Sequence, residues 1–302
     1  MVFSPAVISQ TEAFMKANFL LHKVPKRMSR VLYERFPEPL HLNILSIFVA
    51  LFGSYKTKIA FDLVVRQQYA FSLLKAAELA QMQGLKSVTV IEFGVAAGAG
   101  LMNICNISRN ITKLTGVEFQ IFGFDSGQGM PPPRDHRDHP EVFSQGSFPL
   151  IDRGALMRAL PQNARLILGD IQETLPHFMA GLSPSSPLGF VVIDVDYYSS
   201  AKDCLNVFLG EADSYLPCTL VYLDDIGFES ANPWTGELLA VREFNEENEL
   251  RKIHSFGGLR HKRLFKHTSW FDQVYLLHVL DHPRRSVSGA RKEIKVITNP
   301  YL

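Results

Sequence analysis

Short apolar runs alternate with helix-length amphipathic stretches from Gly84 onward, and several of these runs end in glycine or aspartate. This alternation is typical of βαβ units, in which a parallel sheet is buried on both faces. The stretch 257–270 is polar and offers no crossover helix, so we expect the last strand to enter antiparallel. The expected strands are 87–95, 119–124, 165–168, 190–193, 219–223 and 274–280, and the expected helices are 101–114, 154–160, 172–179, 201–215 and 236–249.

The predicted fold class is therefore α/β: a Rossmann-like doubly wound sheet of about seven mostly parallel strands, with an antiparallel last strand. Residues 9–83 carry few β-branched runs and often place apolar residues at helical spacing. We therefore divide the 302 residues into a helical N-terminal lid or interface segment (1–85), a core (86–282) and a basic C-terminal tail (283–302). Sheets of this kind bind ligands at the carboxyl ends of their strands.

Composition excludes several classes of protein. The 31 basic residues balance 30 acidic ones, whereas a protein that tracks nucleic-acid phosphates would show a basic excess. The apolar run 42–53 is shorter than the ~20 residues that cross a bilayer, so we expect a buried or interface helix and no membrane span. Three isolated cysteines and an N-terminus without a secretory pattern predict a reducing, cytoplasmic location.

The end of the first expected strand runs into small residues and then a helix, so backbone N–H groups there can approach a ligand closely. The order is E-x-G-x-x-x-G-x-G rather than the dinucleotide fingerprint G-x-G-x-x-G. A carboxylate beside the turn repels a pyrophosphate and suits a cationic amino or sulfonium group, which favours a charged amino-acid nucleoside over NAD. A tight turn without a ligand is the alternative. The candidate ligand residues are Glu92, Phe93, Gly94, Val95 and Gly98.

The second and third strands also end in acids. Asp125, followed by Ser126, is placed to accept hydrogen bonds from ribose hydroxyls, although both residue types also favour helix N-caps. The third strand leads into Gly169, Asp170 and Ile171. Asp170 binds an adenine amino group or caps the following helix, and the residues alone leave these two roles equally open.

Four carboxylates follow the fourth and fifth strands: Asp194, Asp196, Asp224 and Asp225. Acids at the ends of neighbouring strands repel one another when they are dry and unpaired. A hard divalent cation held by oxygen ligands resolves that conflict, so we predict a metal site. In the alternative, one aspartate caps a helix and another accepts hydrogen bonds from backbone or a cofactor.

Taken together, these segments resemble the class I S-adenosylmethionine-dependent methyltransferases, and more narrowly the macrocin O-methyltransferase family. The family pattern is an E-F-G-V turn, then G-F-D-S, G-D with T-L-P, D-x-D-x-Y-x-S and D-D. The corresponding segments here begin at Glu92, Gly123, Gly169 (with Thr174-Leu175-Pro176), Asp194 and Asp224. The resemblance covers the core and leaves the first ~85 residues and the tail without motifs.

The resemblance implies an S-adenosyl-L-methionine site in which the turn from Glu92 holds the methionine part, Asp125 the ribose and the Asp170 loop the adenine. It also implies a small-molecule hydroxyl acceptor, often a sugar, and Mg²⁺ bound by Asp194 or Asp196 together with Asp224 and Asp225. The chain departs from the family at Ala96-Ala97, where relatives often carry an aromatic residue or arginine, and in the proline-histidine loop 131–140.

For the proton of the acceptor hydroxyl we expect Asp194 or Asp196 as the base, with His136 and His139 as alternatives. A nicotinamide-dependent oxidoreductase is a competing hypothesis, because Tyr198 and Lys202 have Tyr-x-x-x-Lys spacing. A non-catalytic nucleotide-binding protein is a third, although it has no need of the acids. The apolar N-terminal segment favours a homodimer, the commonest soluble assembly.

Overall fold

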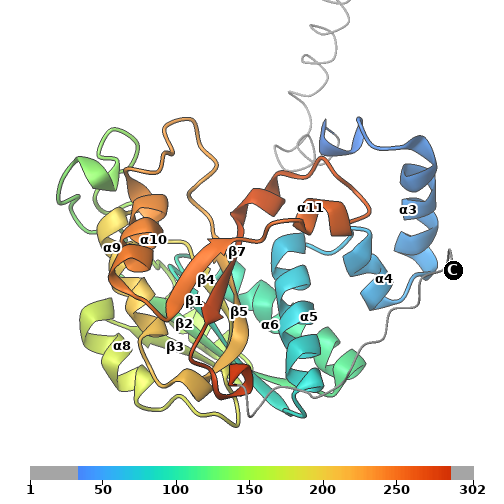
Figure 1. Ribbon diagram of the computed structural model, residues 1–302. Coiled ribbons are helices and arrows are strands. Elements are labelled where there is room, and N and C mark those ends of the chain that lie inside the picture. Colours follow the sequence, from blue (N-terminus) through green and yellow to red (C-terminus); the bar gives the residue numbers. More distant parts are fainter. Residues whose placement is uncertain (1–32, 287–302) are drawn as a thin grey trace, which may run out of the picture. The chain divides into compact units, whose positions relative to one another are not determined.

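A seven-stranded sheet with the strand order β3-β2-β1-β4-β5-β7-β6 forms the centre of the molecule (Figure 1). This computed structural model describes residues 33–286. The five strands from β3 to β5 are parallel, and β7 pairs antiparallel with both β5 and β6. The strands are β1 (Ser87–Phe93), β2 (Glu118–Asp125), β3 (Ala164–Leu168), β4 (Leu188–Ile193), β5 (Tyr215–Leu223), β6 (Arg251–Ser255) and β7 (Val274–Val279).

The predicted doubly wound sheet and its antiparallel last strand are therefore confirmed. Strand β6 lies in no predicted element, because its sequence RKIHS has neither an apolar run nor a clean alternation. It lies at the edge of the sheet and pairs only with β7, so polar residues are tolerated there. Of its five residues, only Arg251 and Ile253 are buried.

Helices cover both faces of the sheet (Figure 1). On one face, α5 (Gln67–Met82) packs against α6 (Ala99–Thr115) and against the central strands. On the other face lie α8 (Ile171–Met179), α9 (Tyr198–Leu205) and α10 (Gly236–Glu247). Helix α9 ends ten residues before the predicted boundary at 215, because the chain continues in two 3₁₀ turns, Asn206–Phe208 and Ala212–Ser214. The short helix α7 (Arg153–Ala159) lies in the connection between β2 and β3.

The central strands are almost entirely buried. All six residues of β4 are buried, and so are the last six of β1. Their β-branched and aromatic side chains pack with α8, α9 and α10 into one apolar core, in which Phe93 and Phe124 lie 5.0 Å apart between ring centroids. A parallel sheet covered on both faces requires such continuous apolar strands. Acids that follow these strands consequently lie at the border of a low-dielectric interior.

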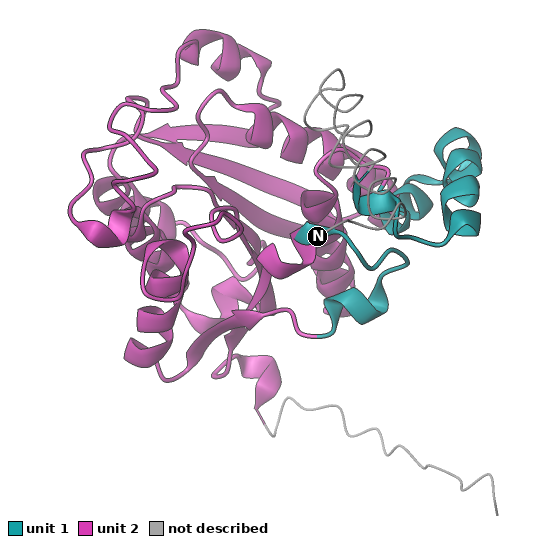
Figure 2. Cartoon of the chain, turned by 90° about the horizontal axis from the view of Figure 1, so that it is seen from above, with its two compact units in different colours: residues 1–62, 258–269 teal, residues 63–257, 270–302 magenta. Residues whose placement is uncertain are grey.

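The chain divides into two compact units (Figure 2). The larger unit is Leu63–Gly257 with Trp270–Leu302 and contains the whole sheet together with α5, a helix that falls within the predicted N-terminal segment 1–85. The smaller unit is Met1–Asp62 with Gly258–Ser269. The predicted tail begins in a 3₁₀ turn, Pro283–Arg285, and its residues from 287 lie outside the described part of the chain.

The smaller unit is held together by buried charges. The carboxylate of Glu38 is buried and accepts the backbone N–H of His267 at 2.7 Å, and Arg263 forms an ion pair with Asp62. The polar stretch before β7 thus joins the N-terminal unit, which explains why it supplies no crossover helix to the sheet.

Helix α3 (Leu40–Phe52) belongs to the smaller unit and covers most of the apolar run predicted to be a helix. It carries no acidic residue in its first turn and no basic residue in its last, and Val49 is its one buried residue. Within residues 33–286 no helix has the length and apolar character needed to span a membrane.

Candidate active site

Acidic side chains from β1, β4 and β5 gather at the carboxyl end of the sheet. Asp194 follows β4, and Asp224 and Asp225 follow β5. One carboxylate oxygen from each of these three residues lies within 4.8 Å of the others, and we call them the acidic cluster. The sequence predicts a group of four aspartates here. Three of them form this cluster, and Asp196 is not one of its members.

Burial and mutual repulsion raise the pKa values of Asp194 and Asp225. Burial raises the pKa of Asp194 well above its usual range, and the charges of Asp224, Asp225 and Asp196 raise it further. Burial together with Asp196 and Asp224 raises the pKa of Asp225 to about 8. The Oδ2 atom of Asp225 is buried and has no hydrogen-bond partner among the residues that the structure describes. A cation at this position would remove both the repulsion and the unsatisfied oxygen.

Asp196 stands beside the cluster in a left-handed backbone conformation, with φ of 60°. A non-glycine residue held there stores of order 1–3 kcal/mol, a cost that is typical of functional positions. Burial and the charge of Asp224 raise its pKa to about 6, opposed by a hydrogen bond with the side chain of Asp225. Its carboxylate is therefore largely ionised at neutral pH and only half-buried.

Glu92 is the most deeply buried acid among the predicted ligand residues, with 1% of its surface exposed. Its Oε1 accepts the Tyr69 hydroxyl at 3.4 Å, while Oε2 has no hydrogen-bond partner within residues 33–286. Burial, and secondarily the charge of Asp194, raises the pKa of Glu92 well above its usual range. A buried carboxylate with one free oxygen is suited to a cationic group of a ligand.

The glycines of the turn after β1 allow close packing. Gly94 has φ of 82°, and a Cβ added to it would lie 1.7 Å from the backbone oxygen of Asp194. A Cβ on Gly100 would lie 1.9 Å from Oε1 of Glu92. A Cβ on Gly98, which has φ of 84°, would meet Leu156 on α7 at 2.5 Å. The turn therefore packs closely against the end of β4, against Glu92 of β1 and against α7. Phe93 and Val95 beside it are buried.

Asp125 binds this turn from the end of β2. Its Oδ2 accepts the backbone N–H groups of Val95 and Ala96 at 2.9 and 2.8 Å, and its Oδ1 accepts that of Gly127 at 2.6 Å. This role differs from both sequence hypotheses, ribose binding and helix capping. Oδ1 accepts one hydrogen bond and keeps a second lone pair, so ribose binding stays a prediction. Ser126 hydrogen-bonds within its own turn, to the carbonyl of Gly129 at 3.1 Å.

Asp170 caps α8: its Oδ1 accepts the backbone N–H of Gln172 at 2.7 Å. The capping role that the sequence leaves open is thus observed, and the adenine role stays a prediction. Gly169 precedes it with φ of 137°, and Ile171 is the first residue of α8. The turn after β3 is therefore held in a defined conformation at the same edge of the sheet as Asp125, whose carbonyl accepts the N–H of Gly169 at 3.0 Å.

Glu237 is a further buried acid, which sequence reasoning missed. It lies in the first turn of α10 and is 1% exposed. Its Oε2 accepts the backbone N–H of Asp225 at 3.2 Å, while Oε1 has no hydrogen-bond partner in the described part of the chain. Burial and the charges of Asp225 and Asp194 raise its pKa well above the usual range. An acid in the first turn of a helix is normally solvated and favoured by the helix dipole, so its sequence carries no signal of burial.

The proline-histidine loop is anchored by a buried aspartate that the sequence does not single out. Asp138 accepts the backbone N–H and the hydroxyl of Ser199 at 2.8 and 3.0 Å, and the backbone N–H of Arg134 at 2.8 Å. It therefore binds the N-terminus of α9, directly after the turn that contains Asp196. Of the two candidate histidines, His136 is exposed, whereas His139 is buried, and its Nδ1 lies 2.9 Å from Glu141.

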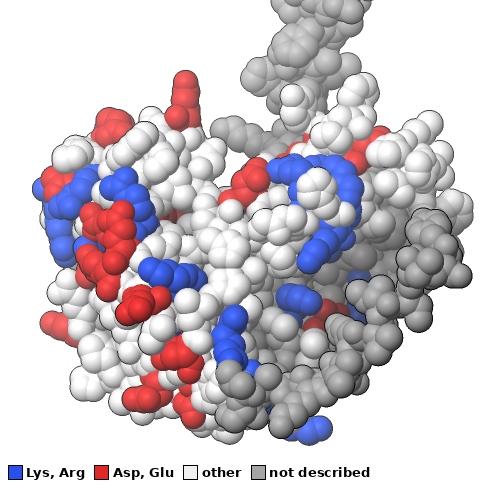
Figure 3. All heavy atoms as spheres, in the orientation of Figure 1, with Lys and Arg blue, Asp and Glu red and all other residues white. Residues whose placement is uncertain are grey.

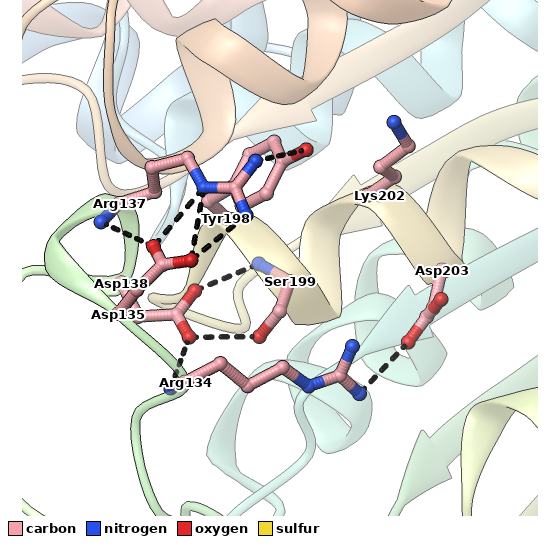
Figure 4. A pocket seen from close by; sticks show the side chains of 8 residues that line it. All are labelled: Arg134, Asp135, Arg137, Asp138, Tyr198, Ser199, Lys202 and Asp203. Atoms are coloured by element: carbon pink, nitrogen blue, oxygen red, sulfur yellow. Dashed lines mark hydrogen bonds and ion pairs between the residues drawn. The ribbon is translucent and has the colours of Figure 1, made fainter.

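A surface cavity of about 150 Å³ lies between this loop and α9 (Figure 4). Tyr198 and Lys202, the pair with oxidoreductase spacing, are among its lining residues. Both donate to Oε2 of Glu243 on α10, at 2.6 and 2.7 Å. Burial and the hydrogen bond to Glu243 raise the pKa of Tyr198. A tyrosine that acts as a catalytic acid–base needs a lowered pKa and an open hydroxyl, so these contacts indicate a structural pair.

Charged side chains of both signs are mixed over the face shown in Figure 3, and the short helix α11 (Leu259–Lys262) has three basic residues in its last turn. The acidic cluster is thus a local feature of a chain whose net charge is +1. The absence of a nucleic-acid partner stays a prediction.

No protein-family model matches this chain, and no curated protein is a significant match. Solved structures do match. The O-methyltransferase NovP is 20% identical, with 59% of this chain and 71% of that chain covered and a TM-score of 0.43. The calicheamicin methyltransferase CalS11 is 20% identical, with 85% and 91% covered and a TM-score of 0.46. The O-methyltransferase TomG from Streptomyces achromogenes is 13% identical, with 83% and 95% covered and a TM-score of 0.36. The identity of this chain to these three methyltransferases is 13–20%, so its activity has to be inferred from its own residues.

Proposed function

We propose that this chain is an S-adenosyl-L-methionine-dependent O-methyltransferase that acts on a hydroxyl of a small molecule, such as a sugar or natural product, with help from a divalent metal. The single observation that carries the proposal is the acidic cluster, whose three carboxylates approach within 4.8 Å beside the buried Glu92. Such a concentration of acids fits a cationic cofactor and a hard cation, and it repels phosphate groups.

The residues at the turn after β1 fit the amino-acid end of the cofactor. The free Oε2 of Glu92 supplies an acceptor for an ammonium group in a site from which water is excluded. Asp125 and the Asp170 turn stand next along the same edge and would take the ribose and the adenine. The cofactor supplies an electrophilic methyl group, so the protein's task is to orient the acceptor and to remove its proton.

The acidic cluster fits Mg²⁺, because all three ligand groups are carboxylates and one of their oxygens is buried without a partner. When bound, the ion would lower the pKa of an acceptor hydroxyl and fix its oxygen. Asp194, Asp224 and Asp225 would hold it. Asp196 is then the proposed proton acceptor, because it is adjacent to the cluster, half-buried and, with a pKa of about 6, ready to take a proton at neutral pH.

Calorimetry with S-adenosylhomocysteine tests the cofactor, and methyl transfer to a panel of hydroxyl compounds, with and without chelator, tests the metal. We expect binding by the full chain, and activity that a chelator removes and Mg²⁺ restores. Absence of binding at millimolar ligand would contradict the proposed function, and activity that survives exhaustive chelation would contradict the metal. Asp203→Asn is a matched control, because Asp203 lines the surface cavity beside α9 and is outside the acidic cluster.

The assembly that we propose is a homodimer formed through α3. Seven large apolar residues of this helix, each 45–83% exposed, present on the order of 800 Å² of surface, about what one partner buries in a standard interface. Patches on monomers are usually smaller. An interfacial membrane helix would need lysine or arginine on its polar face, and α3 has none. The seven residues are Leu40, Ile44, Leu45, Ile47, Phe48, Leu51 and Phe52.

Sedimentation velocity tests this assembly. The measured mass should be twice the 34.0 kDa of one chain. Phe48→Glu should convert the dimer to a monomer, whereas Met82→Glu, at an exposed position of α5, should leave the dimer intact. A wild-type monomer would contradict the proposed homodimer.

We also propose a cytoplasmic location, because the cysteines Cys105, Cys204 and Cys218 are all unpaired.

A further inference from the structure

Arg66 is a basic residue that faces the acids of the candidate site. It precedes α5 as its N-cap residue and has a left-handed backbone conformation, with φ of 54° and ψ of 65°. An arginine gains nothing locally from this conformation and makes no side-chain cap. The surrounding structure therefore maintains a strained backbone that aims this side chain, which is a pattern typical of binding sites.

Among the described residues, a single hydrogen bond holds the guanidinium. Its Nη1 donates to the Tyr69 hydroxyl at 3.1 Å, and its Cζ lies 5.1 Å from the centroid of the Tyr69 ring. Tyr69 is fully buried and donates in turn to Oε1 of Glu92. Because a guanidinium carries five N–H donors, most of the donors of this half-buried arginine are open to a ligand.

The acids around Arg66 act on it at a distance and are not paired with it. Burial lowers the pKa of Arg66, but Tyr69 and the charges of Glu92, Asp194 and Asp224 outweigh this and raise it. Within residues 33–286, no carboxylate oxygen lies within 4.0 Å of its guanidinium nitrogens. A cation held among acids without touching them is positioned for an anionic group that enters with a ligand.

We propose that Arg66 is the subsite for the carboxylate of the cofactor's amino-acid end, opposite Glu92, which takes its ammonium. This inference rests on the proposed function and names the part of the ligand that each residue recognises. An amino-acid end is a zwitterion, and a site made of acids alone would repel its carboxylate. Arg66 and Glu92, joined through Tyr69, supply one opposite charge for each pole.

The test compares two probes by calorimetry: S-adenosylhomocysteine and its analogue that lacks the carboxylate. In the wild-type chain we expect loss of the carboxylate to weaken binding on the order of 10- to 100-fold, the range of a charge-assisted hydrogen bond. In Arg66→Gln the two probes should bind within about twofold of each other, and Arg66→Lys should fall between. Arg165→Met, at an exposed position of the edge strand β3, is the control and should keep the wild-type ratio.

The outcomes separate this inference from the proposed function. If the wild-type chain binds neither probe, the proposed function fails, and the inference fails with it. If wild type binds S-adenosylhomocysteine and Arg66→Gln shifts both probes equally, Arg66 is a counter-ion for the acids and the carboxylate subsite is wrong. Thermal unfolding of each variant checks its fold, and because the readout is a ratio within one variant, modest destabilisation does not alter it.

Discussion

Replacement of Asp138 by alanine should detach the proline-histidine loop from α9. The Asp138 side chain is fully buried and accepts three hydrogen bonds, two from Ser199 and one from the backbone of Arg134. Alanine would leave the Ser199 N–H, in the first turn of α9, without an acceptor. A buried donor left unsatisfied costs about 1–3 kcal/mol, and the lost negative charge at a helix N-terminus about 0.3–1 kcal/mol. With the loop contact included, we expect the free energy of unfolding to fall by about 3 kcal/mol, out of a total of about 5–15.

Urea unfolding followed by circular dichroism measures this loss. Asp152→Ala is the matched control, because Asp152 caps α7 through the N–H of Ala155 at 2.8 Å but is exposed and acts within its own helix. An exposed cap is worth about 1 kcal/mol. Asp138→Asn keeps one acceptor oxygen and should cost about half as much as alanine. If Asp138→Ala costs no more than Asp152→Ala, the buried carboxylate does not hold the loop and our interpretation of these contacts is wrong.

Three further predictions concern the acids and the surface cavity. We expect Mg²⁺ to raise the melting temperature of the wild-type chain in differential scanning fluorimetry, and Asp225→Asn should abolish this rise; an unchanged rise would remove Asp225 from the proposed metal site. In the presence of chelator, the stability of the wild-type chain should fall as pH rises from about 4 to 8. The pKa values of Asp196 (about 6) and Asp225 (about 8) lie above the ordinary 3.8 of an unfolded chain. The folded state therefore binds more protons than the unfolded state across that window. Melting temperatures that rise between about pH 5.5 and 8 would contradict this sign. Tyr198→Phe should leave methyl transfer within about threefold of wild type, since its lost hydrogen bond to Glu243 affects stability alone; loss of activity would reopen a catalytic role for this tyrosine.

The sheet was predictable because its central strands are long apolar runs, and such runs have one stable arrangement between two helical layers. The same reasoning placed acids at the strand ends, because the carboxyl ends of parallel strands meet at one edge of a sheet. It failed for β6, whose polar residues suit an edge, and for the end of α9, where 3₁₀ turns replace a helix of similar pattern. Local sequence does not encode such endings.

Burial from distant chain segments was also beyond sequence reasoning. Glu237 and Asp138 look like surface acids in the first turn of a helix. Asp138 instead accepts the N–H of Ser199, 61 residues away, and Glu237 accepts that of Asp225, 12 residues away in another turn. Arg66 carries no motif and falls within the N-terminal segment that the sequence sets apart from the core. Its relation to Glu92 depends on Tyr69 of α5, a helix that packs against the central strands. Long-range contacts of this kind have to be seen in the structure.

The position of Gly94 links the winding of the chain to the acidic cluster. The chain winds outward from β1 to β3 and then returns to β4 on the other side of β1, so the winding direction reverses between β1 and β4, the position at which such sheets bind ligands. Pairing continues one residue beyond the strands, since the N–H of Asp194 donates to the carbonyl of Phe93 and that of Asp224 to the carbonyl of Ile193, both at 3.1 Å. The first of these contacts leaves no room for a side chain at Gly94.

Gly94→Ala should therefore displace Asp194 and weaken metal binding. An added Cβ would lie 1.7 Å from the Asp194 carbonyl oxygen, so the end of β4 has to move. Gly84→Ala is the matched control, because Gly84 has a similar φ of 73° but nothing within 4 Å of the added Cβ. Both variants lose about 1–2 kcal/mol to a left-handed alanine, but only Gly94→Ala should also reduce the stabilisation by Mg²⁺. Equal effects of Mg²⁺ on the two variants would show that the strand ends tolerate a shift, and the cluster would then not depend on the register of β1 and β4.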